Sequence, residues 1–496
     1  MQSRRLLGLR THGTCQRYKS SVLTKSDLKE KTDDHPTASE TIPEKRGLPF
    51  IGNLIELIMS NGAAQLHKYI DNRHKQLGPI FQEKLGSENC IFVSSANLMR
   101  SVFLYEGQYP KHPIPEAWNL YNEKHDCQRG LFFMNGSEWL NNRRLMNKLL
   151  LNGNCNWMND NIEKYTRKCT TQWSEDIDKS GKGFVEINDL ERQLYRWSIN
   201  VLCSIMFGES FDRIDSNPRL EAKLSEFTDN VHKIFTSTTR LMSFPPKLAE
   251  ALNLKRWTDF EENVDLVLQL GNGIVDEFLK ESPCDDGLVL KMKEVDMSLD
   301  MIKRIFVDLI IAAGDTTAFS SQWLIYLLSK NEDIQTKVRE EIHSSNNWME
   351  NPYIKGLIRE TLRLYPVAPF IGRYLASDAV IGNYKIDKNS LVLLSLYTSG
   401  RDENHFPDAE KVLPERWIRN ENGELTLVHK AHGTLPFALG GRSCIGRKIA
   451  LNQMQALVAM MTSNFNVKYC APYDVDITLR LVAVPDKPIL LRLEKI

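Results

Sequence analysis

Apolar residues recur at helical spacing through much of the chain. Positions three and four residues apart, typical of one face of an α-helix, are apolar at 66–77, 139–151, 190–207 and 264–279. A longer apolar stretch at 301–330 predicts a central, buried helix. Helical patterns therefore dominate between about residues 60 and 360.

Strand-like segments are short and cluster late, at 379–386, 390–397, 477–484 and 488–493. No internal repeat and no low-complexity boundary divides the chain after the polar, linker-like stretch 27–42. We therefore expect a mainly α fold with small β-sheets, folded as one domain over residues 36–496.

The first 26 residues contain six basic side chains and no acidic one. This composition is typical of a mitochondrial transit peptide, and a disordered basic tail is the alternative. We predict that residues 1–35 are a transit peptide and linker. The chain has no apolar run of about 18 residues, so no membrane-spanning anchor is expected.

Composition narrows the function classes. The 63 basic and 63 acidic side chains balance, which argues against a broad nucleic-acid-binding surface. Nine cysteines occur without a C-x-x-C pair, so a disulfide scaffold or a structural zinc site is not favoured. A reduced compartment fits this cysteine usage.

The stretch "FALGGRSCIG" surrounds Cys444 with Gly440, Gly441 and Gly446, just before a helical segment. Glycines allow backbone N–H groups to approach a thiolate, and a helix N-terminus favours negative charge. A zinc or redox site, a catalytic thiol and a thiolate held against a metal cofactor all need to be considered. A single thiolate suits haem, which supplies its other ligands, and Arg442 can bind a carboxylate; an incidental cysteine in a glycine-rich turn is the alternative.

The central helix carries small residues at 312–314, followed by Asp315 and Thr316. Small side chains leave room for a ligand, and an acid beside a hydroxyl can relay protons. A helix-packing notch with a solvated aspartate gives the same pattern.

Two further pairs share helix faces. Glu360 and Arg363 lie three residues apart, and Arg416 of "LPERW" is a candidate partner; this group is structural. Trp139 and Arg143 lie four apart and can bind one anionic group, although an aromatic core anchor beside a solvated arginine is the simpler interpretation.

Together these motifs resemble the cytochrome P450 family over residues 43–496. "FALGGRSCIG" fits F-x-x-G-x-R-x-C-x-G, Glu360 and Arg363 fit E-x-x-R, and Trp139 and Arg143 fit W-x-x-x-R. The resemblance implies the single-domain cytochrome P450 fold, with haem b between a long central helix and a cysteine-ligand loop.

The resemblance also implies a role for each matching residue. Cys444 would be the axial ligand of the haem iron, and Asp315 and Thr316 would deliver protons to the reacting oxygen. Ala313 stands where the family usually has glycine. The remaining cofactor-binding residues, mainly for the haem propionates, would be Arg442, Trp139, Arg143, Arg373 and Phe437.

"EGQYPKHP", "GLFFMNGSEW" and "GRKIA" resemble the mitochondrial branch of the family. That branch takes electrons from NADPH through a ferredoxin reductase and an acidic, adrenodoxin-like ferredoxin, on the matrix side of the inner membrane. The resemblance implies peripheral association with this membrane. The ferredoxin-docking face would include Lys355, Arg359, Arg447 and Lys448. For any one of these residues taken alone, a solvated helix charge is the simpler interpretation.

Within this branch, "AAGDTTAFSSQW", "RLYPVAPFIGRYL" and "SLYTSGRD" resemble arthropod ecdysteroid 2-hydroxylases. This implies hydroxylation of a steroid, 2-deoxyecdysone, at C-2 to give ecdysone. Another sterol or a foreign compound remains an alternative substrate. A haem-thiolate isomerase or dehydratase needing no external electrons, and a non-catalytic haem or lipid-binding protein, are the rival functions.

Overall fold

The computed structural model describes residues 40–49, 51–60, 62–85, 88–152, 155–242, 244–281, 286–344 and 347–496. They belong to one compact unit, Ala38–Ile496. The predicted transit peptide and linker, residues 1–35, lie outside the described residues. Within these ranges no helix is both long and apolar enough to cross a membrane.

The long helices follow the apolar periodicity closely. Helices α2 (Leu66–Leu77) and α7 (Leu190–Phe207) coincide with their predicted segments, and α5 (Gly136–Leu150) and α10 (Lys255–Glu281) include most or all of theirs. The central helix α12 (Leu299–Lys330) is 32 residues long. The Ser298 hydroxyl caps it by accepting a hydrogen bond from the Met301 N–H.

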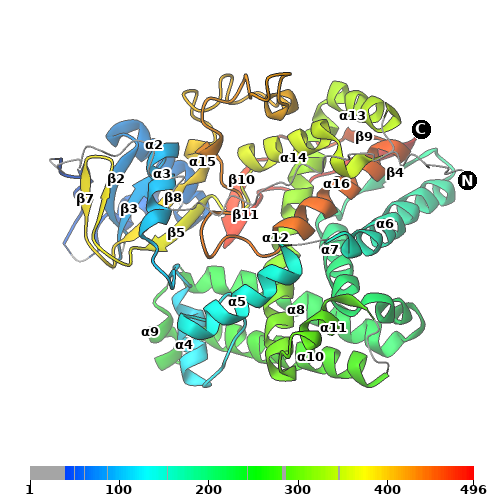
Figure 1. The fold of residues 1–496 in the computed structure, drawn as a ribbon, viewed down its shortest axis with the longest axis horizontal. Coiled ribbons are helices and arrows are strands. Elements are labelled where there is room, and N and C mark those ends of the chain that lie inside the picture. The colour runs from blue at the N-terminus through cyan, green and yellow to red at the C-terminus, as the bar shows by residue number, and fades with distance from the viewer. Residues whose placement is uncertain are drawn as a thin grey trace, which may run out of the picture. The chain divides into compact units, whose positions relative to one another are not determined.

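Figure 1 shows α12 crossing the middle of this unit, and α7, α10 and α14 pack against it. The other α-helices are α1 (Leu54–Met59), α3 (Ala96–Val102), α4 (Glu116–Lys124), α6 (Asn159–Ser180), α8 (Pro218–Met242), α9 (Pro246–Ala251), α11 (Gly287–Glu294), α13 (Glu332–Ser344), α14 (Pro352–Leu364), α15 (Leu396–Ser399) and α16 (Arg447–Asn464).

The largest sheet has five strands in the order β1-β2-β3-β8-β5 and lies on one side of α12 (Figure 1). Its strands are β1 (Glu44–Lys45), β2 (Ile80–Leu85), β3 (Glu88–Val93), β8 (Leu391–Ser395) and β5 (Phe370–Tyr374). The expectation that strands cluster late is wrong for β1, for β2 and β3, and for a short strand at Phe184–Ile187. In β2 and β3 the apolar residues are consecutive rather than alternating, as at 90–93, so period two does not reveal these two strands.

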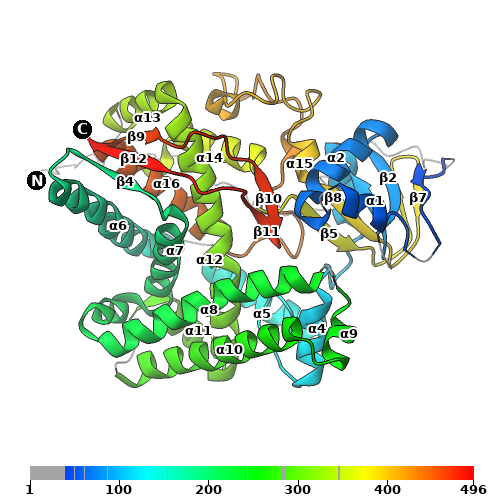
Figure 2. The same cartoon turned by 180° about the vertical axis from the view of Figure 1, so that it is seen from behind.

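The remaining strands form small sheets. A three-stranded sheet has the order β4 (Phe184–Ile187), β12 (Leu491–Lys495), β9 (Phe465–Tyr469). Two hairpins pair β6 (Ala379–Ile381) with β7 (Tyr384–Ile386) and β10 (Ile477–Arg480) with β11 (Val482–Pro485). Figure 2 shows the β10–β11 hairpin beside α12. The predicted mainly α fold with small β-sheets is confirmed.

Candidate active site

The cysteine loop, residues 437–446, folds back on itself before α16. The Cys444 N–H donates to the Phe437 carbonyl at 2.8 Å, which closes the loop around the sulfur. Gly440 has φ +76°, and a Cβ there would lie 1.9 Å from a carboxylate oxygen of Glu106. Only glycine fits at this position because both the backbone conformation and the space exclude a side chain.

Cys444 is exposed on part of its surface, although protein surrounds its sulfur closely on the other sides. Burial raises the pKa of its thiol, while the Gly446 N–H and the charges of Arg143 and Arg447 act in the opposite direction. Burial outweighs these three effects. A metal ion would supply the additional positive charge that turns this thiol into a thiolate.

Three guanidinium groups, those of Arg143, Arg373 and Arg442, gather beside the loop. Arg442 stacks on the Trp139 ring at 4.4 Å, and Arg373 Nε donates to Glu106 at 3.0 Å. Burial and repulsion by the two other arginines lower the pKa of Arg442 to about 10. We call these five residues the arginine cluster. Its single carboxylate leaves an excess of positive charge, which fits a cofactor carrying two carboxylates.

His112 adjoins the arginine cluster and was not predicted. Burial, followed by repulsion from Arg442 and Arg373, lowers its pKa to about 3. Its Nε2 and the Nε of Arg143 are buried and have no hydrogen-bond partner among the described residues. Two spare hydrogen-bonding groups at this place fit the propionates of haem, because buried polar atoms are normally paired.

The buried part of the central helix α12 is interrupted by one exposed or half-exposed group of residues. Every residue from Ile305 to Leu328 is buried except Ala312, Ala313 and Thr316. Their spacing puts these three residues on one face of α12. We call this face the open strip, and its small side chains leave space for a ligand against the helix.

The predicted acid and alcohol lie on different sides of α12. Thr316 belongs to the open strip, and its Oγ1 donates to the Ala312 carbonyl at 2.7 Å. The Asp315 side chain is 1% exposed, and its Oδ1 lies 3.4 Å from Nδ1 of His232 on α8. Burial raises the pKa of Asp315, and His232 acts against this rise.

The segment 129–135 joins the cysteine loop to α12. Arg442 Nη1 donates to the Phe132 carbonyl at 3.3 Å, and the Phe132 N–H donates to Asp308 Oδ2 on α12 at 3.4 Å. Arg129 Nη2 donates to the other Asp308 oxygen at 3.2 Å, and both side chains are buried. Position 130 must be glycine, since a Cβ there would lie 2.5 Å from the Arg304 carbonyl oxygen.

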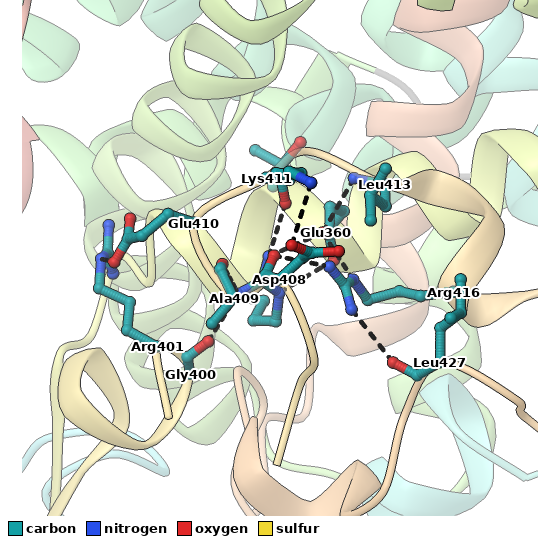
Figure 3. A network of polar contacts seen from close by, with 12 residues as sticks. Glu360, Gly400, Arg401, Asp408, Ala409, Glu410, Lys411, Leu413, Arg416 and Leu427 are labelled. Carbon is teal, nitrogen blue, oxygen red and sulfur yellow. Dashed lines mark hydrogen bonds and ion pairs between the residues drawn. The ribbon is translucent and has the colours of Figure 1, made fainter. Parts of the chain in front are cut away.

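Glu360, Arg363 and Arg416 form a fully buried network (Figure 3). Glu360 Oε1 accepts from Arg363 at 2.7 Å and from Arg416 at 2.9 Å, while Oε2 accepts from the Trp417 indole at 2.8 Å. The remaining guanidinium N–H groups donate to backbone carbonyls, including those of Gly400, Pro407, Ala409 and Leu427. We call this the Glu360 network.

The four predicted docking residues lie on two helices that pack against each other. Lys355 and Arg359 are on α14, and Arg447 and Lys448 begin α16. Lys355 pairs with Glu350 at 2.6 Å, and the exposed Arg359 guanidinium lies 5.9 Å from the centre of the Trp417 ring. All four side chains are partly or fully exposed.

The family model described as "Cytochrome P450" matches residues 42–493 of this chain. The chain therefore belongs to the cytochrome P450 family, and it is a haem-thiolate monooxygenase of the mitochondrial type.

Mitochondrial cytochrome P450 315a1 of Drosophila melanogaster is 52% identical over 91% of this chain and 88% of its own length. The mitochondrial cholesterol side-chain cleavage enzyme of Oncorhynchus mykiss is 28% identical over 90% of this chain and 88% of its own. The structure of retinoic-acid-bound cyanobacterial CYP120A1 matches with a TM-score of 0.74 at 20% identity. The match covers 92% of this chain and 100% of the CYP120A1 chain, and it shows that the two proteins share a fold.

Four residues of the site were not predicted from the sequence. Glu106 and His112 lie within "EGQYPKHP", which served only as a marker of the mitochondrial branch. Arg129 and Asp308 form an ion pair between residues 179 positions apart, and neither shows a local motif.

Proposed function

We propose that this protein hydroxylates 2-deoxyecdysone at C-2 to give ecdysone. The assignment as a monooxygenase rests on one observation. Cys444 is exposed beside the arginine cluster, and the central helix carries the open strip. The substrate rests on the motif resemblance and on the 52% identity to the Drosophila protein. Small side chains along the open strip leave room for a rigid apolar molecule.

Each residue has a role in this proposal. The Cys444 sulfur would hold the haem iron, Phe437 supports the cysteine loop, and Arg143, Arg373, Arg442 and Trp139 would bind the haem propionates. Bound haem supplies the chemistry that inserts one atom of O2 into a C–H bond and releases the other as water, with two electrons and two protons. Thr316 holds a hydroxyl at the open strip, and Asp315 supplies protons from within the helix.

The electrons come from NADPH through a ferredoxin reductase and a ferredoxin. Lys355, Arg359, Arg447 and Lys448 present positive charge on the adjacent helices α14 and α16. Such a cluster attracts an acidic partner even though the net charge of the chain is zero. The ferredoxin therefore docks on this face.

The test is reconstitution of purified protein with ferredoxin, reductase, NADPH and a panel of ecdysteroid precursors. We expect 2-deoxyecdysone to become ecdysone, one NADPH to be consumed per product, and Cys444→Ala to abolish conversion. Conversion of other precursors alone would reject the substrate. Product formation without NADPH or ferredoxin would instead identify an isomerase or dehydratase.

Charge reversal tests the docking face in the same assay. Lys355→Glu should raise the ferredoxin KM about fivefold at low salt without changing kcat, because one attractive charge becomes repulsive. Lys255→Glu on α10, an exposed lysine paired with Asp259, is the matched control. Equal effects of the two variants would place the docking face elsewhere.

We also propose peripheral attachment to the matrix side of the mitochondrial inner membrane. Exposed apolar side chains occur at Met242, Leu248 and Leu252 around α9, where they are 56%, 46% and 60% exposed. Such side chains can insert into a lipid interface. Leu248→Ser with Leu252→Ser should reduce flotation with cardiolipin-containing vesicles, whereas Leu427→Ser, elsewhere on the surface, should not. Unchanged flotation would reject this face.

A further inference from the structure

His232 on α8 stands between two carboxylates, one buried and one exposed. Its Nδ1 lies 3.4 Å from Asp315 Oδ1, and its Nε2 lies 3.8 Å from Glu191 Oε1 on α7. The side chains of His232 and Glu191 are 41% and 45% exposed, whereas that of Asp315 is 1% exposed. The imidazole therefore spans the distance between solvent and the buried acid of the central helix.

The groups around the imidazole come from three neighbouring elements. The α12 carboxylate of Asp315 raises the pKa of His232 most, Glu191 on α7 raises it further, and burial and Arg480 on β10 lower it. Tyr195 on α7 meets the imidazole edge to face at 5.8 Å. The net result is a raised pKa, so the imidazolium persists to higher pH than that of an ordinary histidine.

Solvent reaches the imidazole directly, because the His232 side chain is 41% exposed, and a cleft lies nearby against Tyr195. A cleft of about 420 Å³ is lined by residues of α6, α7 and α8, among them Tyr195 and Asp229. The Tyr195 hydroxyl is buried and has no hydrogen-bond partner in the ranges that the structure describes. The cleft therefore adjoins Tyr195, which packs on the imidazole, while His232 meets solvent through its own exposed surface.

Asp315 needs a proton donor on this side. In the proposed function Asp315 gives up a proton during each turnover, yet its carboxyl is buried and faces α8 rather than the open strip. Direct reprotonation by bulk water is slow for a carboxyl that bulk water does not reach. A half-exposed imidazole in contact with it removes this obstacle.

We infer that His232 is a positioning residue that reprotonates Asp315, with Glu191 holding the ring from the solvent side. This inference rests on the proposed oxygen chemistry. One proton moves from Nδ1 of the imidazolium to the Asp315 carboxylate, which leaves a neutral ring and a neutral acid. The ring then takes one proton from solvent, so each delivered proton is replaced and His232 regains its charge.

The test compares His232→Gln with a matched histidine. Glutamine keeps hydrogen-bonding groups but does not titrate. His125→Gln is the control. His125 also pairs with a glutamate, because its Nε2 lies 2.7 Å from Glu261 on α10, but it makes no contact with Asp315. Glu191→Gln tests the solvent-side contact.

The first readout does not require turnover. The pKa of His232, measured by NMR on protein with labelled histidine, should lie above its ordinary value of about 6.5 and should fall in Asp315→Asn, because the carboxylate that raises it is removed. An unchanged value in Asp315→Asn would overturn the inference, since the two groups would then not be coupled. Lack of activity with 2-deoxyecdysone would reject the proposed function but would leave this result standing.

The second readout follows the fate of the electrons. His232→Gln should lower kcat about tenfold at constant KM, raise the solvent isotope effect and divert NADPH toward hydrogen peroxide. Activity of the unmodified protein should fall as pH rises through the pKa of His232, and this limb should be absent in His232→Gln. The inference would be overturned if His232→Gln kept the wild-type pH profile and the wild-type ratio of product to NADPH consumed. An equal loss of kcat in His125→Gln would also overturn it.

Discussion

The Glu360 network and the arginine cluster both gather buried guanidinium groups, but only one of them is complete. In the Glu360 network, both carboxylate oxygens accept charged hydrogen bonds, and backbone carbonyls accept from the remaining N–H groups. In the arginine cluster, only Arg373 of the three guanidiniums bonds the single carboxylate, and Arg143 Nε has no partner among the described residues. The first group stabilises the fold by itself, and the second is arranged for an anionic ligand.

The difference shows how to tell a structural charge cluster from a binding site. Sequence motifs place arginines in both groups, so the motif alone does not separate them. The separation comes from counting carboxylates and unpaired N–H groups. Carbonyl oxygens accept from Arg442, but the arginine cluster has one carboxylate for three guanidiniums and leaves Arg143 Nε unpaired among the described residues.

The largest expected effect comes from breaking the complete network. Glu360→Gln leaves Arg363 and Arg416 buried without an anionic partner, which should cost about 3 to 5 kcal/mol of unfolding free energy. Urea unfolding measures this loss, and failure to obtain folded protein would agree with it. Glu350→Gln, which removes an exposed partner of Lys355, should change stability by less than about 1 kcal/mol. Similar values for the two variants would contradict the comparison.

A smaller effect is expected when one arginine is removed from the incomplete cluster. Arg143→Gln should leave the stability of haem-depleted protein within about 1 kcal/mol, since it also relieves repulsion. Haem should dissociate about tenfold faster, because a charge-assisted hydrogen bond is lost. Transfer of haem to an excess of apomyoglobin measures this rate, with Arg144→Gln, an exposed neighbour, as control. A large loss of stability with an unchanged rate of haem release would instead show that the arginine cluster stabilises the fold and does not bind the cofactor.

The smallest effect concerns pH. The pKa of His112 is about 3 in the folded protein and about 6.5 when unfolded, so below pH 6.5 the unfolded chain binds an extra proton. Stability is therefore lost as pH falls, by about 0.7 kcal/mol between pH 7 and pH 6 from this residue. Urea unfolding of haem-depleted His112→Asn should show a correspondingly flatter pH dependence. An equal change in His343→Asn, an exposed histidine, would exclude His112 as the source.

Local patterns predicted much of the fold. The periodicity of α2 and α7 gave their boundaries, and the apolar stretch at 301–330 predicted a central helix that begins at Leu299. Strand β3 escaped because both of its faces are buried, which removes the alternation that marks a half-exposed strand.

The site was less predictable, because motifs do not show where side chains point. Asp315 and Thr316 are adjacent in sequence, but the helix turns about 100° per residue and directs them to different neighbours. His232 carries no local signal, since a single histidine on an amphipathic helix is common. Its contact with Asp315 joins residues 83 positions apart and is visible only in the folded chain.

The distances along the chain between bonded residues also differ for the two charge groups. Glu360 bonds partners 3 to 57 residues away. Arg442 instead binds the Pro110 carbonyl 332 residues away, and Arg373 binds Glu106 267 residues away. Closing such long loops is entropically costly and slow. The Glu360 network can therefore assemble from one contiguous segment, residues 360–427, whereas the haem pocket is complete only when the first and last thirds of the chain have met.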